Sequence, residues 1–351
     1  MALKILHTAD FHLKDYEDER WLALKKVCEI GKKEEIDLFL IAGDLFDKGV
    51  DAERLRPKIR ELFSSFNFLF IILPGNHDMD CFKKGFDFGD NVKIISEGES
   101  LYERKEIRIL GLPFRFTEEK EVLRALYNLN EKIDSNKKNI LLYHGELLDL
   151  FFSNSDRESL YMPARLSYFK DLKIDYVLAG HFHSKFEVRK ISNEKYFVYC
   201  GSPISITQKE KGQRKVNIFK VGEPPREYLI DTPYFEEKKI DISPLKHKNP
   251  VKEVKRAIEG LPPQAKLILT LSGFLDKKRI PFSERGLKEE IREILPPSCQ
   301  FNFEVRDITE ILESDLFKEF SSKLAQRDLP SEKKEEVFRL VVEAMAQTFY
   351  Q

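Results

Sequence analysis

Side chains that can bind metal ions gather in five short clusters along this 351-residue chain. Each cluster follows a predicted apolar strand, and together the clusters hold five of the seven histidines. They are Asp10-Phe11-His12, Gly43-Asp44-Leu45-Phe46-Asp47, Gly75-Asn76-His77-Asp78, His144-Gly145 and Gly180-His181-Phe182-His183. Imidazole, carboxylate and amide groups are ligands of first-row divalent ions such as Mn²⁺, Fe²⁺ and Zn²⁺. Because loops beyond the carboxyl ends of strands bring distant residues together, the pattern predicts one metal centre.

The spacing within the clusters favours convergence. Residues two apart on an extended segment point to the same side, about 6–7 Å apart, so Asp10 and His12 can face one centre. The same holds for His181 and His183. Asp44 follows a glycine that permits close backbone approach, and its two carboxylate oxygens make it the expected bridge between two ions. One cluster alone would be a weak signal, whereas five in order are not explained by chance.

A centre with two divalent ions suits a phosphate substrate. The ions carry four positive charges, Asp10 and Asp44 contribute −2 and a bridging hydroxide −1, which leaves about +1 to attract a phosphodiester. Two ions roughly 3.5–4 Å apart also lower the pKa of bound water and clamp the phosphoryl oxygens during in-line attack. The residues therefore indicate hydrolysis of a phosphate ester.

His77 is expected to have a different part in the reaction. It directly follows Asn76, so the two side chains point apart and His77 is expected above the metal ions. There it is placed to protonate the leaving group or to hold the phosphate. Asp47 is expected to orient His77 and keep it protonated. His7 and His247 lie outside the clusters and are interpreted as structural or exposed.

Alternating strands and helices predict an α/β fold with stacked sheets under helices. The expected strands are Lys4–His7, Asp37–Ala42, Phe68–Leu73, Val92–Ile95, Ile107–Leu110, Asn139–Tyr143, Tyr176–Ala179, Tyr196–Cys200, Val216–Lys220 and Glu227–Ile230. The expected helices are Glu19–Glu35 and Ala52–Ser65. Continuous apolar strands of this kind are typical of sheets covered on both faces.

A change in composition near Thr232-Pro233 predicts a domain boundary. Residues 1–231 are expected to form the catalytic domain and residues 232–308 a small α+β capping domain. The capping domain is expected to contain strands Phe235–Ile242, Lys266–Leu271 and Phe301–Val305 with helices Pro250–Gly260 and Ser283–Ile294.

Residues 309–351 are expected to form a pair of amphipathic helices, Glu313–Gln326 and Ser331–Thr348, with Ser331 as the N-cap of the second. Leu340, Met345 and Phe349 spread around that second helix, beyond what one facing helix covers. We therefore expect the pair to dock a partner. The alternative is that the helices only complete the capping domain.

Composition limits the location and the partners. The formal net charge of −1 argues against a surface coated with basic residues, although a local basic rim beside a metal centre suffices for nucleic-acid binding. We expect no signal peptide, and no apolar run reaches the roughly 18 residues of a membrane span. The four cysteines form no CxxC pair, which favours the cytoplasm.

The ordered set of motifs resembles that of the calcineurin-like metallophosphoesterases. Within that superfamily the chain looks most similar to the SbcD nuclease family and its double-strand-break-repair counterparts in archaea and eukaryotes. The supporting stretches are Ile5–Leu13, Ala42–Asp47, Leu73–Asp78, Asp175–His183 and Tyr199–Pro203. Phe11 stands where tryptophan is frequent and Lys14 where glycine is usual, which concerns the shape of the DNA-facing loop rather than the ligands.

The resemblance implies a layered α/β/β/α fold and a DNA nuclease of repair and recombination. It implies one metal ion at Asp10, His12, Asp44 and His183, and another at Asp44, Asn76, His144 and His181, with Mn²⁺ as the expected ion. His77 matches the family's catalytic histidine. The family works with an SbcC-type coiled-coil ABC ATPase, gripped by a C-terminal helix-loop-helix, and a homodimer is expected.

Three other functions fit the residues less well. A phosphoprotein phosphatase usually has Gly-Asp-x-x-Asp-Arg-Gly and Gly-Asn-His-Glu, whereas this chain has Lys48 and Asp78 at the differing positions. A small-molecule phosphodiesterase would hardly need the C-terminal extension, and a non-catalytic scaffold would be expected to have lost ligands. From their positions beside the motif loops, the expected DNA-contacting residues are Lys14, Lys48, Arg115, Lys185 and Arg214.

Overall fold

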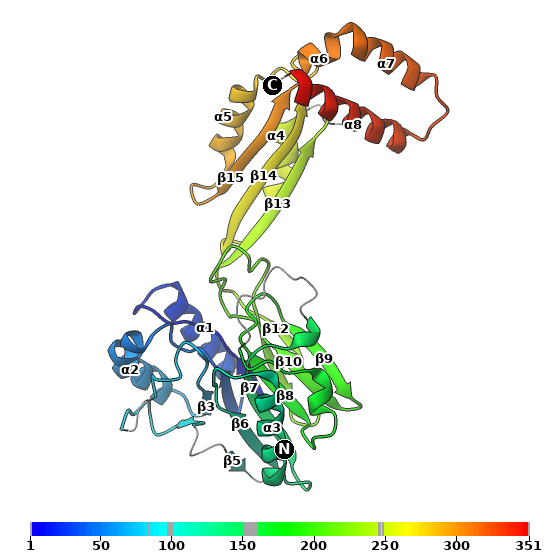
Figure 1. Cartoon of the computed structure of the whole chain (residues 1–351). Coiled ribbons are helices and arrows are strands. Elements are labelled where there is room, and N and C mark those ends of the chain that lie inside the picture. Colours follow the sequence, from blue (N-terminus) through cyan, green and yellow to red (C-terminus); the bar gives the residue numbers. More distant parts are fainter. Residues whose placement is uncertain are drawn as a thin grey trace. The chain divides into compact units, whose positions relative to one another are not determined.

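The computed structural model describes residues 2–82, 85–96, 101–104, 106–150, 161–244, 247 and 249–349. The chain forms two compact units, Met1–Phe235 and Glu236–Gln351 (Figure 1). The division falls four residues after the expected end of the catalytic domain at residue 231, and residues 309–351 belong to the second unit.

The first sheet of the N-terminal unit has the strand order β12-β11-β1-β2-β3-β4. Its strands are β1 (Lys4–Thr8), β2 (Leu38–Ala42), β3 (Leu69–Leu73), β4 (Val92–Ile94), β11 (Lys215–Lys220) and β12 (Glu227–Leu229). β1, β2 and β3 run parallel, so their carboxyl ends meet at one edge of the sheet. The loops with Asp10, Asp44 and Asn76 leave from that edge.

The second sheet has the order β5-β6-β7-β8-β10-β9. Its strands are β5 (Leu101–Arg104), β6 (Ile107–Leu112), β7 (Lys138–His144), β8 (Tyr176–Gly180), β9 (Glu187–Ser192) and β10 (Lys195–Tyr199). β7 and β8 are parallel, and His144 pairs with Gly180 at their ends. His144 and His181 therefore leave the sheet side by side.

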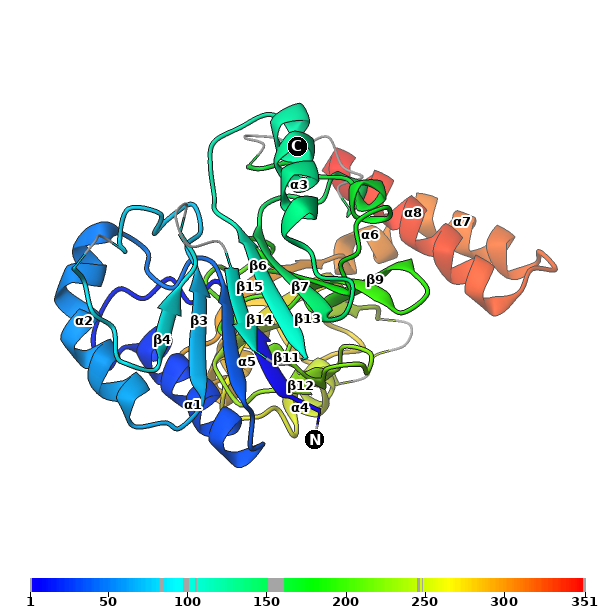
Figure 2. The ribbon, with the colours of Figure 1, turned by 90° about the horizontal axis from the view of Figure 1, so that it is seen from below.

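The two sheets face each other across a core of aliphatic side chains from both. Its members include Ile5, Leu40, Ile71, Ile140, Leu142, Leu178 and Val198. Helices α1 (Glu19–Lys33) and α2 (Gly49–Ser64) cover the outer face of the first sheet, and α3 (Glu119–Leu129) covers that of the second (Figure 2). The expected α/β/β/α layering is confirmed.

In the part of the N-terminal unit that the structure describes, one α-helix, α3, and two strands, β5 and β9, were not expected from the sequence. For α3 the sequence nevertheless contains a helical signal, because Val122, Leu126 and Leu129 are spaced so that they share one buried side of the helix. The strands β5 and β9 lie at the edges of the second sheet and are largely exposed. Their charged sequences do not indicate strands. Each becomes a strand only because it forms hydrogen bonds with the neighbouring strand of the sheet.

The C-terminal unit contains the three-stranded sheet β13-β14-β15. Its elements are β13 (Tyr234–Ile242), α4 (Pro250–Ile258), β14 (Ala265–Leu275), α5 (Glu284–Ile294) and β15 (Gln300–Asp307). Val254 of α4 and Leu287 of α5 pack on Leu269 and Leu271 of the sheet. This unit is α+β, as expected.

The chain then forms α6 (Thr309–Glu313), α7 (Asp315–Ala325) and α8 (Ser331–Phe349). The single helix expected over Glu313–Gln326 is therefore wrong at its start. The backbone of Ser314 is extended, and its hydroxyl accepts the N–H of Phe317 at 3.2 Å, so a new helix begins there. In the part of the chain that the structure describes, no helix has the length and apolar character to cross a membrane.

Candidate metal centre

Four of the expected ligand residues have a backbone conformation that side-chain-bearing residues rarely adopt. The φ angles are 59° for Asp10, 48° for His12, 53° for Asp44 and 89° for His181. Aspartate and histidine tolerate the left-handed region better than most residues. The Asp10 N–H donates to the carbonyl of Gly43 at 3.0 Å, which ties two of these loops together. Such conformations cluster at functional sites because the surrounding structure must hold them.

Two glycines let the loops approach closely. Gly43 has φ of 100°, and a Cβ there would lie 1.9 Å from His144 Nδ1. A Cβ on Gly75 would lie 2.2 Å from Asp44 Oδ1. Any larger residue at either position would displace an expected ligand, so the glycines are needed by the site itself.

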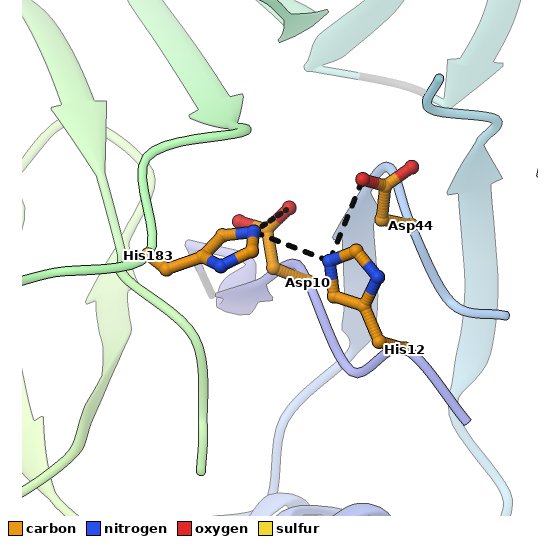
Figure 3. A group of neighbouring side chains, drawn as sticks. All are labelled: Asp10, His12, Asp44 and His183. Carbon is orange, nitrogen blue, oxygen red and sulfur yellow. Dashed lines mark hydrogen bonds and ion pairs between the residues drawn. The ribbon is translucent and has the colours of Figure 1, made fainter. Parts of the chain in front are cut away.

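Asp10, His12, Asp44 and His183 form the first group of converging side chains (Figure 3). His12 Nε2 lies 3.2 Å from His183 Nε2 and 3.6 Å from Asp44 Oδ2. His183 Nε2 lies 3.7 Å from Asp10 Oδ1. All four residues are buried or half-buried.

Asn76, His144 and His181 form a second group beside the first. Asn76 Oδ1 lies 2.9 Å from His144 Nε2 and 3.2 Å from His181 Nδ1. Asp44 Oδ2 lies 3.3 Å from His144 Nε2, and so Asp44 belongs to both groups. The fold thus brings together all seven side chains expected to bind metal.

The first group fits a divalent cation. Bonds of about 2.0–2.2 Å place the ligand atoms of one ion roughly 3–3.6 Å apart, which is close to the spacing observed here. Two unprotonated ring nitrogens at 3.2 Å, as in His12 and His183, repel unless a proton or a cation lies between them. Asp10 and Asp44 add two buried carboxylates that need a positive partner.

Three histidines are oriented in the same way. His12 Nδ1 lies 3.5 Å from Asp47 Oδ1, His144 Nδ1 lies 2.8 Å from the carbonyl oxygen of Ala42, and His183 Nδ1 lies 3.3 Å from Glu210 Oε1. An acceptor at Nδ1 keeps the proton there and leaves Nε2 facing the centre. Partners of this kind orient metal-binding imidazoles in many proteins.

Glu210 is a site residue that the sequence does not predict. Its side chain is buried, and besides contacting His183 it accepts hydrogen bonds from the N–H of Ile206 at 2.7 Å and from Ser202 Oγ at 3.1 Å. Burial opposes its ionisation, but His183 and these donors outweigh burial and lower the pKa of Glu210. Its run Lys209-Glu210-Lys211 is typical of an exposed turn, so no local signal identifies it.

The carboxylate of Asp47 lies within 4.8 Å of ring nitrogens of both His77 and His12. Its carboxylate contacts His12 and lies 3.2 Å from Lys14 Nζ, and the hydrogen bond with His12 is the main cause of its lowered pKa. His77 Nδ1 lies 3.2 Å from the backbone carbonyl oxygen of Asp47. The exposed ring of His77 lies edge-on to His12, with 4.6 Å between the ring centroids. His77 therefore lies on the solvent side of the ligand groups.

Asp78 is a second residue whose part in the site the sequence does not predict. It is fully buried and accepts the N–H of Gly75 at 2.7 Å and of Phe46 at 3.2 Å. Burial and the negative charge of Asp44 raise the pKa of Asp78 to about 7. Asp78 thus binds the loop after β3 to the loop after β2.

The carboxylates set the charge of the neighbouring rings. Burial disfavours the charged form of His144, but Asp44 and Asp10 outweigh burial and raise the pKa of His144 to about 9. Burial likewise opposes ionisation of Asp44, yet His144 and His12 hold the pKa of Asp44 below its usual range. Asp44 is therefore ionised at neutral pH and available to a cation.

One of the expected DNA-contacting residues is excluded. Arg214 is 3% exposed, and its guanidinium donates to the carbonyl oxygens of Ser202 at 2.9 Å, Ser184 at 3.1 Å and His183. It braces the loop that holds His183, because a buried guanidinium needs acceptors. Lys14, Lys48, Arg115 and Lys185 are exposed, as a contact with DNA requires.

Comparison with known proteins finds relatives that are named as components of a nuclease. The SbcD component of nuclease SbcCD from Staphylococcus epidermidis is 27% identical over 246 residues, which are 61% of this chain and 64% of the relative. The protein of the same name from Staphylococcus saprophyticus is 28% identical over 252 residues, or 62% and 66%. The chain thus spans slightly less than two thirds of the length of these relatives.

Among solved structures, a dimetal phosphatase from Danio rerio is similar with a TM-score of 0.46 and 11% identity, over 62% of this chain and 92% of that one. The family model for calcineurin-like phosphoesterases matches residues 3–185, more than half of the chain. That span contains every side chain of the two ligand groups, from Asp10 to His183. On this match the chain belongs to the calcineurin-like phosphoesterase family.

Proposed function

We propose that this protein is a dimetal-dependent DNA nuclease that hydrolyses phosphodiester bonds. The observation that carries the proposal is the convergence of seven donor side chains from five loops, with Asp44 shared by both groups. One cation would be held by Asp10, His12, Asp44 and His183, and the other by Asp44, Asn76, His144 and His181. Bound divalent cations supply Lewis-acid charge that promotes ionisation of water and offsets the charge of the phosphate. Mn²⁺ is the expected ion.

His77 is proposed to protonate the leaving oxygen. Its Nδ1–H is directed to the carbonyl oxygen of Asp47, which leaves Nε2 to transfer a proton. The exposed position of the ring, against His12, supports this function, since a general acid must reach the substrate rather than the ligands.

The choice of DNA as substrate rests on the relatives, which are named as components of a nuclease. A phosphoprotein phosphatase or a small-molecule phosphodiesterase of the same superfamily is the alternative. Lys48 and Asp78 differ from the residues usual in the phosphatase motifs. The chain also has a second unit, Glu236–Gln351, that hydrolysis of a small molecule would not require.

The deciding experiment is hydrolysis of end-labelled single- and double-stranded DNA with Mn²⁺ or Mg²⁺. A phosphopeptide and bis(p-nitrophenyl) phosphate serve as the competing substrates. Asp44→Ala is the control: it should empty at least one metal site and abolish hydrolysis. Cleavage of the phosphopeptide but not of DNA would contradict the proposal, and so would full metal content and full activity in Asp44→Ala.

We also propose that the C-terminal helices dock an SbcC-type coiled-coil ATPase, and that the protein acts in DNA repair as a homodimer in the cytoplasm. Leu316 of α7 is 67% exposed and Leu340 of α8 is 59% exposed. Phe338 and Val342 are instead buried against Phe274 and neighbouring apolar residues. The side chain of Phe349 lies outside the described residues.

Truncation after Ile308 is a poor test of docking, because it would uncover the apolar cluster that includes Phe274. Leu316→Asp and Leu340→Asp change only exposed positions. If the helices dock the ATPase, these variants should keep their thermal stability and lose co-purification with it. Unchanged co-purification would contradict the docking surface. The proposed homodimer is tested separately, by measuring the mass of the protein in solution by sedimentation.

A further inference from the structure

Three aromatic rings, each in contact with the other two, form a cluster beside the second ligand group. We name Phe114, Phe116 and Tyr161 the aromatic ledge. The centroid of Phe114 lies 5.0 Å from that of Phe116 and 5.9 Å from that of Tyr161. Phe116 and Tyr161 are 5.5 Å apart. The rings therefore support one another as a unit.

The ledge begins at the ligands and ends in solvent. The ring of Tyr161 lies 5.2 Å from that of His181, and the ring of Phe114 lies 6.2 Å from that of His144. Phe114 is 5% exposed, whereas Phe116 is 67% exposed. A nucleotide whose phosphate lay at a cation held by His144 and His181 would have its base within reach of these rings.

Packing does not explain the outermost ring. Phe114 is buried and contributes to the core beneath α3, but the greater part of Phe116 faces water. An exposed aromatic ring beside a phosphate-binding centre is typical of proteins that hold unpaired nucleotides, since every base has a flat face that stacks on the ring.

We propose that Phe116, backed by Phe114 and Tyr161, is a stacking platform for the base next to the phosphate that is cleaved. This inference rests on the proposed nuclease function. In a duplex the bases are paired and stacked on each other, so the platform accepts a base only when it is unpaired. The substrate class is therefore single-stranded DNA or the frayed end of a duplex.

The test compares Phe116→Ala, Phe116→Leu and Phe116→Trp with the wild-type protein. Leucine keeps an apolar side chain without the flat face, and tryptophan keeps the face. Tyr127→Ala is the matched control, because Tyr127 is also an exposed aromatic residue, at 56%, on helix α3. The substrates are a single-stranded oligonucleotide and the same oligonucleotide with abasic residues flanking the cleaved bond.

Phe116→Ala should raise KM for the intact oligonucleotide roughly 5- to 150-fold, the range expected for one stacked base, with a smaller effect on kcat. It should have little effect on the abasic substrate. Phe116→Trp should restore KM, Phe116→Leu should not, and Tyr127→Ala should behave as wild type. Equal losses on intact and abasic substrates would overturn the platform. The platform would also be overturned if Phe116→Ala weakened binding of a protein partner but left KM for DNA unchanged.

A binding measurement separates this inference from the nuclease proposal. An oligonucleotide with 2-aminopurine loses fluorescence when that base stacks on an aromatic ring. Wild-type protein should quench the fluorescence, and Phe116→Ala should not. Equal quenching by both proteins overturns the platform, whereas quenching without any DNA hydrolysis overturns only the nuclease proposal.

Discussion

Glu210 Oε1 lies 3.3 Å from Nδ1 of the half-buried His183, and this contact turns the other nitrogen of His183 toward Asp10 and His12. The carboxylate is held in turn by the N–H of Ile206. Glu210 is thus fixed by the backbone and in turn fixes His183, so it is a positioning residue for a proposed ligand.

Glu210→Gln should weaken binding of Mn²⁺ roughly 10- to 100-fold, the usual cost of losing a partner behind a metal-binding histidine. Calorimetric titration with Mn²⁺ measures this without reference to activity. Glu227→Gln is the control, because Glu227 pairs with Lys215 at an exposed position. Unchanged affinity in Glu210→Gln would show that the pair only stabilises the loop.

His77→Ala should lower kcat roughly 10²- to 10⁴-fold, as expected for removal of a general acid. Both metal ions should stay bound, since His77 is exposed and lies outside the two ligand groups. Elemental analysis together with turnover measures both effects. Loss of metal along with activity would mean that His77 is itself a ligand.

Asp47→Asn should act through His12. The substitution keeps the shape but removes the charge that faces His12 Nδ1 at 3.5 Å. Metal affinity should therefore fall, with a smaller loss of activity than in His77→Ala, while the pH–rate profile keeps its shape. A shifted profile with unchanged metal affinity would instead support the expectation from the sequence that Asp47 keeps His77 protonated.

His7 should make stability depend on pH. It is completely buried, and its ring nitrogens lack a hydrogen bond of good geometry among the described residues. Burial, offset in part by the carbonyl of Ala179, lowers the pKa of His7 to about 3. In the unfolded chain His7 binds a proton as the pH falls below about 6.5, whereas in the folded chain it stays neutral until about pH 3. The free energy of unfolding therefore keeps its full value above pH 6.5 and decreases as the pH falls from 6.5 toward 3.

Between pH 7 and pH 5 this linkage amounts to roughly 2 kcal/mol. His7→Leu should remove that part of the pH dependence, because leucine does not titrate. Urea unfolding of both proteins at several pH values measures the difference between them. Parallel stability curves for the wild type and His7→Leu would contradict the assignment.

Much of the fold and of the candidate site can be predicted from the sequence, because apolar strand runs and ligand motifs are both local features of the chain. Strands covered on both faces are nearly all apolar, as β2 is, so their positions and the layered fold follow from short runs of residues. Ligands gather beyond the ends of such strands, and Asp10, Asp44 and His181 stand within two residues of a strand end. Edge strands such as Glu187–Ser192 lack this signal, since their order depends on a neighbour.

The tertiary structure alone decided which partner each side chain meets. Glu210 is 27 residues from His183 in the chain, and Arg214 is a charged residue that the fold buries behind the same loop. Asp47 was expected to orient His77, and its carboxylate also meets His12, at 3.5 Å. Pairings of this kind depend on loop conformations and on contacts between distant segments, and neither residue type nor spacing encodes them. The sequence thus names the chemistry, whereas long-range packing determines how each ligand is oriented.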